Sequence, residues 1–91
     1  MTDKETEILN ILQEECAEVV QAVSKCNRFG LDRNKPGKLK TNRQHLAEEL
    51  GDLQAMIKLV QDANIVSETD VKLASNAKIE KLKIWSTIYR V

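Results

Sequence analysis

The stretch Glu14-Glu15-Cys16-Ala17-Glu18 has a counterpart further along the chain, Glu48-Glu49-Leu50-Gly51-Asp52, and the fold is organised around these two stretches. Both lie in segments whose apolar residues recur at the three- and four-residue spacing of an amphipathic helix. Each stretch places a carboxylate where that pattern calls for a core residue. Burying an ionised side chain costs free energy that a small domain has little core to offset. We therefore expect these carboxylates to serve the function of the protein.

Length and composition indicate a single cytoplasmic domain. The chain has 91 residues, enough for one domain over residues 1–91. Its 14 basic and 14 acidic side chains cancel, so no charge excess indicates nucleic acid or an anionic membrane as a partner. No apolar run approaches the roughly 20 residues of a membrane span. Residues 1–5 are polar, unlike a secretory leader, and Cys16 and Cys26 lie too far apart on one helix to form a disulfide. We expect both cysteines to be reduced, small core residues.

The apolar pattern predicts an all-α fold of three long helices, at about residues 3–27, 42–64 and 68–89. The chain has few aromatic residues, three glycines and one proline, a composition that does not favour a β-rich fold. Residues that can cap a helix precede each segment: Thr2 with Glu5, Thr41 with Gln44 and, more weakly, Ser67 with Asp70.

The apolar stripe of the first helix surrounds Glu15. The stripe consists of Ile8, Ile11, Leu12, Val19, Ala22, Val23 and Cys26. Glu15 falls near its middle, Glu18 at its edge, and Glu14 further round the same side. On the second helix, Glu49 and Asp52 project from inside a wide apolar arc. Because each pair is spaced i, i+3, its two members lie on one face, one turn apart.

The two pairs meet if the first two helices pack antiparallel. Glu15, Glu18, Glu49 and Asp52 would then repel one another and lose hydration. Either several of these carboxylates are protonated or a cation neutralises them. An all-oxygen set, with no Cys or His at ligand spacing, favours Mg²⁺ or Mn²⁺ over zinc. Such a site typically serves phosphate chemistry.

Basic residues are available to contact phosphates. Lys78 and Lys81 lie on the apolar face of the third helix, so either their stems carry the ammonium groups to solvent or they meet phosphate oxygens. Lys25 follows Glu18 by two turns and is a further candidate for substrate binding. His45, near the start of the second helix, is either a residue of helix entry or a ligand contact. Because the sequence has no glycine-rich phosphate loop, metal and side chains must hold the phosphates.

A basic loop separates the first two helices. Asn27–Gly30 is expected to end the first helix, and Pro36-Gly37 supplies a turn. Residues 28–40 contain five basic residues and one acidic residue. The loop is either a solvated linker or a basic flap that meets an anionic ligand. Phe29, beside it, either packs against the helix end or contacts a nucleobase.

The carboxylate motifs resemble those of a known family. Glu14-Glu15-x-x-Glu18 and Glu49-x-x-Asp52 resemble the EExxE…ExxD signature of the MazG-like, all-α nucleoside triphosphate pyrophosphohydrolases, and Ala47–Leu53 is especially close. Asn76-x-Lys78, followed by Lys81, resembles the Asn-x-Lys and downstream basic residue of the family's last helix. The resemblance covers most of the chain. The spacing between the two carboxylate motifs is long for the family because of the basic loop.

This resemblance implies a three-helix subunit that completes a four-helix-bundle core as a homodimer, sometimes within a dimer of dimers. It implies a Mg²⁺-dependent enzyme that cleaves a nucleoside triphosphate between its α and β phosphates, giving a monophosphate and pyrophosphate in nucleotide-pool house-cleaning. The motifs assign metal binding to Glu15, Glu18, Glu49 and Asp52, catalysis to Glu14 and Glu15, with Glu14 an outer ligand or the base that orients water, and phosphate contacts to Asn76, Lys78 and Lys81.

Two alternatives stay open from the sequence. A phosphoribosyl-ATP pyrophosphatase has a similar size and similar carboxylate motifs, and differs in substrate. A non-catalytic helical interaction module would use the acidic residues for solubility or partner choice, and Mg²⁺ would neither stabilise its fold nor support hydrolysis. Helical spacing places Glu15, Glu49 and Asp52 on the core-facing sides of their helices, which counts against such a module.

Overall fold

The chain forms three helices in a computed structural model that describes residues 1–34 and 36–90. Helix α1 spans Asp3–Phe29, α2 spans Asn42–Asp62 and α3 spans Glu68–Trp85. Within the described residues the only β-type pairing is an isolated bridge between Asn34 and Thr41. The predicted all-α fold is confirmed.

The predicted caps begin all three helices. The Thr2 hydroxyl accepts a hydrogen bond from the Glu5 N–H (3.1 Å), while the Thr2 N–H donates to the Glu5 carboxylate (2.8 Å). Thr41 and Gln44 make the same reciprocal pair at the start of α2. The Ser67 hydroxyl accepts from the Asp70 N–H at the start of α3 (3.1 Å). Each cap satisfies backbone donors that have no partner inside the helix.

The helix ends differ from the prediction mainly in α3. Helix α1 ends at Phe29, and Gly30 follows with φ +92°, at the position where the sequence predicted the helix to stop. Asn64, with φ +57°, follows the end of α2. Helix α3 ends at Trp85, although the apolar spacing predicted helix to about residue 89. Ser86 leaves the helical conformation, with φ −123°, and its hydroxyl accepts a hydrogen bond from the Ile88 N–H. This local bond competes with continuation of the helix.

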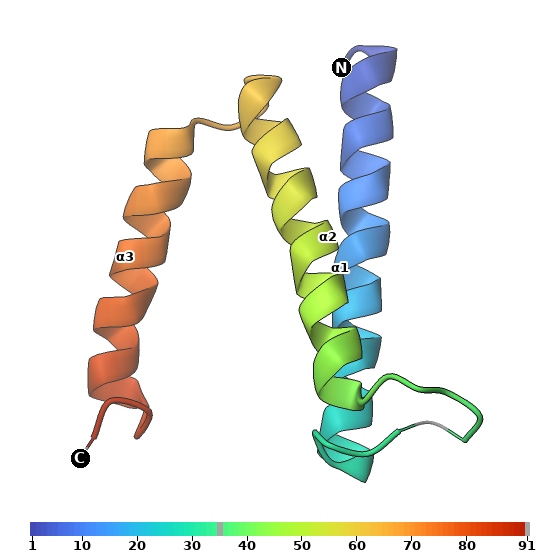
Figure 1. The fold of residues 1–91 in the computed structure, drawn as a ribbon. Coiled ribbons are helices and arrows are strands. Elements are labelled where there is room, and N and C mark those ends of the chain that lie inside the picture. The colour runs from blue at the N-terminus through green and yellow to red at the C-terminus, as the bar shows by residue number, and fades with distance from the viewer. Residues whose placement is uncertain (35, 91) are drawn as a thin grey trace.

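Helices α1 and α2 pack antiparallel and hold the core (Figure 1). The buried cluster contains Ile8 from α1 and Met56 and Val60 from α2. Partly buried residues pack against it: Ile11, Leu12, Ala63 and Ile65. This cluster lies toward the start of α1 and the end of α2, and Ala22 is buried separately, toward the end of α1. The core is small, as expected because a short chain buries a smaller fraction of its surface than a long one.

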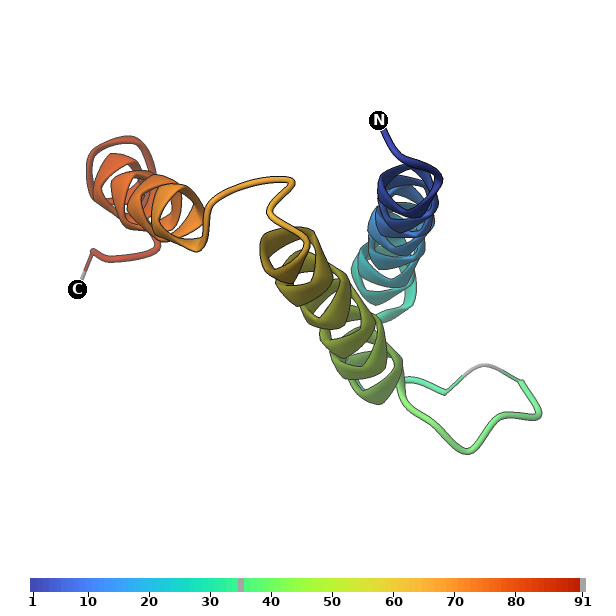
Figure 2. The ribbon, with the colours of Figure 1, turned by 90° about the horizontal axis from the view of Figure 1, so that it is seen from above.

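Helix α3 lies apart from the helix pair, beyond α2 and away from α1 (Figures 1 and 2). None of its residues is buried, and Leu73, Ile84 and Trp85 are 61, 68 and 84 % exposed. The chain is 42 × 38 × 14 Å, one helix layer thick. A four-helix-bundle core formed by dimerisation therefore stays a prediction. Within the described residues, no helix is long and apolar enough to cross a membrane.

Both cysteines are free, and the expectation that both are core residues is wrong for Cys16. Cys26 is half-buried, and its thiol donates a weak hydrogen bond to the Asn42 carbonyl (3.5 Å between Sγ and O). Cys16 is exposed, because its side of α1 has no neighbour within one chain.

Two glycine substitutions should separate backbone strain from helix propensity. Gly30 has φ +92° and ψ 154°, a region that is essentially restricted to glycine, so Gly30→Ala should destabilise the fold by about 1–3 kcal/mol. Gly51 lies inside α2, and a Cβ there meets nothing within 4 Å. Gly51→Ala should therefore stabilise the metal-free protein by up to about 1 kcal/mol. Urea unfolding at one fixed protein concentration measures both, and equal effects would contradict this account of the α1 end.

Candidate metal centre

The antiparallel packing of α1 and α2 brings the two carboxylate motifs together. Glu15 comes from the middle of α1, and Glu49 and Asp52 lie one turn apart on α2. One carboxylate oxygen from each of the three lies within 4.8 Å of the others. Glu15 and Glu49 are half-buried, and Asp52 is exposed. We call these three residues the carboxylate cluster.

The carboxylate cluster carries uncompensated negative charge. Loss of hydration raises the pKa of Glu15, and the charges of Asp52, Glu49, Glu18 and Glu14 raise it further. Within the described part of the chain, no ion pair links Glu15 or Asp52 to a basic side chain. The repulsion is therefore not relieved by the protein itself, and a bound cation would relieve it.

Glu49 has one neighbour that the sequence left ambiguous. His45 precedes it by one turn on α2, and His45 Nε2 lies 3.2 Å from Glu49 Oε1. Both side chains are largely shielded, at 30 and 14 % exposed. His45 therefore lies directly beside a member of the carboxylate cluster, a placement that fits a role at the site better than one at helix entry alone.

The other two predicted acidic residues lie outside the carboxylate cluster. Glu18 is exposed, one turn after Glu15, and lines a neighbouring pocket. Glu14 is also exposed. Both are close enough for their charge to raise the pKa of Glu15. Metal binding by Glu18 and a catalytic role for Glu14 stay predictions.

The predicted substrate-binding residues fall into two separate places. Lys25 is half-buried on α1 and lines the same pocket as Glu18. Asn76, Lys78 and Lys81 are exposed on α3, which packs on neither of the other helices. Within a single chain these three residues are therefore not brought to the carboxylate cluster.

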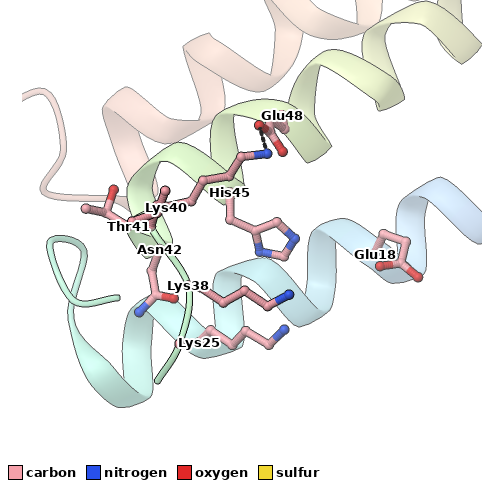
Figure 3. A pocket seen from close by; sticks show the side chains of 10 residues that line it. Glu18, Lys25, Lys38, Lys40, Thr41, Asn42, His45 and Glu48 are labelled. Atoms are coloured by element: carbon pink, nitrogen blue, oxygen red, sulfur yellow. Dashed lines mark ion pairs between the residues drawn. The ribbon is translucent and has the colours of Figure 1, made fainter. Parts of the chain in front are cut away.

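A pocket of about 500 Å³ adjoins the carboxylate cluster, between α1, the basic loop and the start of α2 (Figure 3). Its lining residues are Glu18, Lys25, Gly37, Lys38, Leu39, Lys40, Thr41, Asn42, His45 and Glu48. The sequence indicated this site through the basic excess of the loop and through Lys25 and His45, which were candidates for ligand contact. It did not identify Lys38, Lys40 or Asn42, because their proximity to α1 depends on how the loop folds back.

These features define an all-helical protein with three convergent carboxylates between two antiparallel helices. Comparison with protein families matches residues 3–84 to the MazG nucleotide pyrophosphohydrolase domain. The chain belongs to this family. No curated protein and no solved structure matches the chain.

The raised pKa of Glu15 predicts a pH-dependent effect of its charge on stability. Below its ordinary pKa of 4.5, Glu15 is protonated in the folded and unfolded chains, so its charge costs nothing. As the pH rises from 4.5 through the raised pKa, ionisation destabilises the folded chain. In EDTA, Glu15→Gln should therefore melt above the wild type at pH 7 and together with it below pH 4.5.

Thermal melting from pH 4 to 8 measures this difference. Glu7→Gln is the matched control, because Glu7 is exposed on α1 and lies outside the carboxylate cluster. A melting temperature of Glu15→Gln at or below that of the wild type at pH 7 would refute the proposed repulsion.

Proposed function

We propose that this protein is a Mg²⁺-dependent nucleoside triphosphate pyrophosphohydrolase, which converts a ribo- or deoxyribonucleoside triphosphate to the monophosphate and pyrophosphate. The observation that carries the proposal is the convergence of Glu15, Glu49 and Asp52 within 4.8 Å, in a chain of the MazG nucleotide pyrophosphohydrolase family. A surface module would have no reason to gather three carboxylates, two of them without a basic partner among the described residues, between its two core helices.

The donor set fits a hard divalent cation. All three groups offer carboxylate oxygens, which Mg²⁺ and Mn²⁺ prefer, and the pKa of Glu15 is raised first by loss of hydration and then by the negative charge of its acidic neighbours. Glu15, Glu49 and Asp52 would hold the ion, with Glu18 one turn away as a further ligand. When bound, the cation supplies charge neutralisation for phosphate oxygens and acidifies a coordinated water.

The chain's own residues orient the reactants. The reaction adds one water across the α–β phosphoanhydride: one phosphorus takes the hydroxyl oxygen, and the bridging oxygen leaves with the other group. Glu14, exposed beside Glu15, is proposed to accept a hydrogen bond from that water and hold it in line with the scissile bond. His45, whose Nε2 lies 3.2 Å from Glu49 Oε1, is proposed to orient Glu49 for metal binding.

Helix α3 is proposed to act from a second copy of the chain. It buries nothing within its own subunit, yet it exposes Leu73, Ile84 and Trp85, an apolar surface typical of an interface. A homodimer would cover this surface and complete a four-helix bundle. It would also place Asn76, Lys78 and Lys81 of one copy against the phosphates at the carboxylate cluster of the other. The dimer could in turn pair into a tetramer.

The proposed reaction removes nucleoside triphosphates from the pool, so we propose a house-cleaning role in the cytoplasm. The shape of the site leaves the base and the sugar open. A panel of standard and modified nucleotides, scored for pyrophosphate release with Mg²⁺, identifies the preferred substrate.

Removal of one cluster carboxylate should abolish both metal binding and hydrolysis. We expect Glu15→Gln and Asp52→Asn to lose at least ~100-fold in pyrophosphate release, because charge stabilisation of this kind typically contributes that much. Both variants should also lose the rise in melting temperature that Mg²⁺ gives the wild type. Glu7→Gln serves as the control and should retain both. Wild-type turnover in either cluster variant would exclude the proposed ligands.

Mixing two inactive variants tests whether α3 acts across subunits. Glu15→Gln damages the carboxylate cluster, and Lys81→Gln damages α3. If α3 acts from the partner, each mixed dimer contains one fully intact site, so mixing the two proteins after subunit exchange should restore pyrophosphate release to about a quarter of the wild-type level. If α3 acts on its own subunit, every site in the mixture carries one defect. No recovery despite proven subunit exchange would contradict the proposal.

A further inference from the structure

Hydrogen bonds hold the described residues of the basic loop in a defined conformation. Its two ends are joined by hydrogen bonds: the Asn42 N–H donates to the Arg33 carbonyl (2.9 Å), and the Arg43 guanidinium makes two bonds to the Asp32 carboxylate (3.0 and 3.1 Å). Inside the loop, Asn34 Nδ2 donates to the Lys38 and Leu39 carbonyls (3.2 and 3.1 Å). These bonds fix where Lys38 leaves the backbone.

Two lysines of the pocket have no counterion. In Figure 3 the side chains of Lys25, from α1, and Lys38, from the loop, run alongside each other with both ammonium groups directed toward Glu18. Neither lysine forms an ion pair with any residue that the structure describes. Lys40, by contrast, is paired with Glu48, which neutralises that carboxylate. The pocket therefore contains two convergent cations available to an anion.

The pocket and the carboxylate cluster are adjacent, because two residues that line the pocket neighbour members of the cluster. Glu18 lies one turn from Glu15 and also lines the pocket, and His45 lines the pocket while contacting Glu49. Lys25 lies about 10 Å beyond Glu18 along α1, and side chains on a helix lean toward its N-terminus, so the Lys25 ammonium reaches back toward Glu18. A chain of phosphates held at the carboxylate cluster can therefore continue into the pocket.

We propose that this pocket binds the terminal phosphate of the substrate, with Lys25 and Lys38 as its ligands. The inference rests on the proposed function and adds to it the part of the substrate that leaves as pyrophosphate. Each ammonium group donates charge-assisted hydrogen bonds to phosphate oxygens. Of the two carboxylates in the lining, Glu48 is neutralised by Lys40, and Glu18 is the further ligand proposed above for the cation. The pocket thus distinguishes triphosphates from diphosphates.

Direct binding of inorganic tripolyphosphate tests the pocket without hydrolysis of a nucleotide. Calorimetric titrations with and without Mg²⁺ should give dissociation constants at least about tenfold weaker for Lys25→Gln and Lys38→Gln than for the wild type. Lys38→Arg should restore most of the affinity, because it keeps the charge. Lys4→Gln removes the same charge at the opposite end of α1 and should bind as the wild type. Wild-type affinity in both glutamine variants would overturn the assignment.

A comparison of nucleotides identifies which phosphate the lysines hold. Lys38→Gln should weaken binding of a non-hydrolysable nucleoside triphosphate analogue about tenfold more than it weakens binding of the corresponding diphosphate, since the diphosphate lacks the terminal group. Equal losses of affinity for both nucleotides would overturn the inference. A wild-type protein that releases no pyrophosphate, yet binds tripolyphosphate through both lysines, would overturn the proposed function and retain the phosphate pocket.

Discussion

The packing of α1 against α2 is the interaction on which the site depends. It must hold Glu15 against Glu49 and Asp52 although these carboxylates repel one another. The opposing stabilisation comes from apolar burial on both sides of the cluster along α1: Ile8 packs with Met56 and Val60 toward one end of the helix pair, and Ala22 is buried toward the other. The cluster itself stays partly open to solvent, because Asp52 is exposed, so a cation and phosphates can enter.

The same small core explains why α3 matters. A layer of helices one deep cannot bury every side of α2, and Leu50, Ile57 and Leu59 stay exposed. Helix α3 exposes apolar residues of its own and does not cover these three. A second copy of the chain would supply the missing layer. Formation of the dimer would then both stabilise the fold and complete the phosphate site, because both depend on covering the exposed apolar residues of α2 and α3.

The sequence predicted what depends on local interactions. The caps at Thr2, Thr41 and Ser67 and the glycine at the end of α1 each act within a few residues, so their patterns were sufficient. The meeting of Glu15 with Glu49 and Asp52 could be predicted because helical phase and antiparallel packing restrict the outcome. The placement of Lys25 and Lys38 in one pocket could not be predicted, because it depends on how the loop folds back onto α1. The early end of α3 escaped prediction for a similar reason: apolar spacing continues past Trp85, but the Ser86 hydroxyl bonds locally to the backbone.

The central claim is that the carboxylate cluster binds a divalent cation, and anomalous diffraction tests it most directly. Crystals grown with Mn²⁺ would be measured with X-rays near the manganese absorption edge, so that a peak locates the ion independently of activity. The account predicts a peak within coordination distance of carboxylate oxygens of Glu15, Glu49 and Asp52. A peak elsewhere, or no peak at these three residues in crystals that contain bound Mn²⁺, would contradict it.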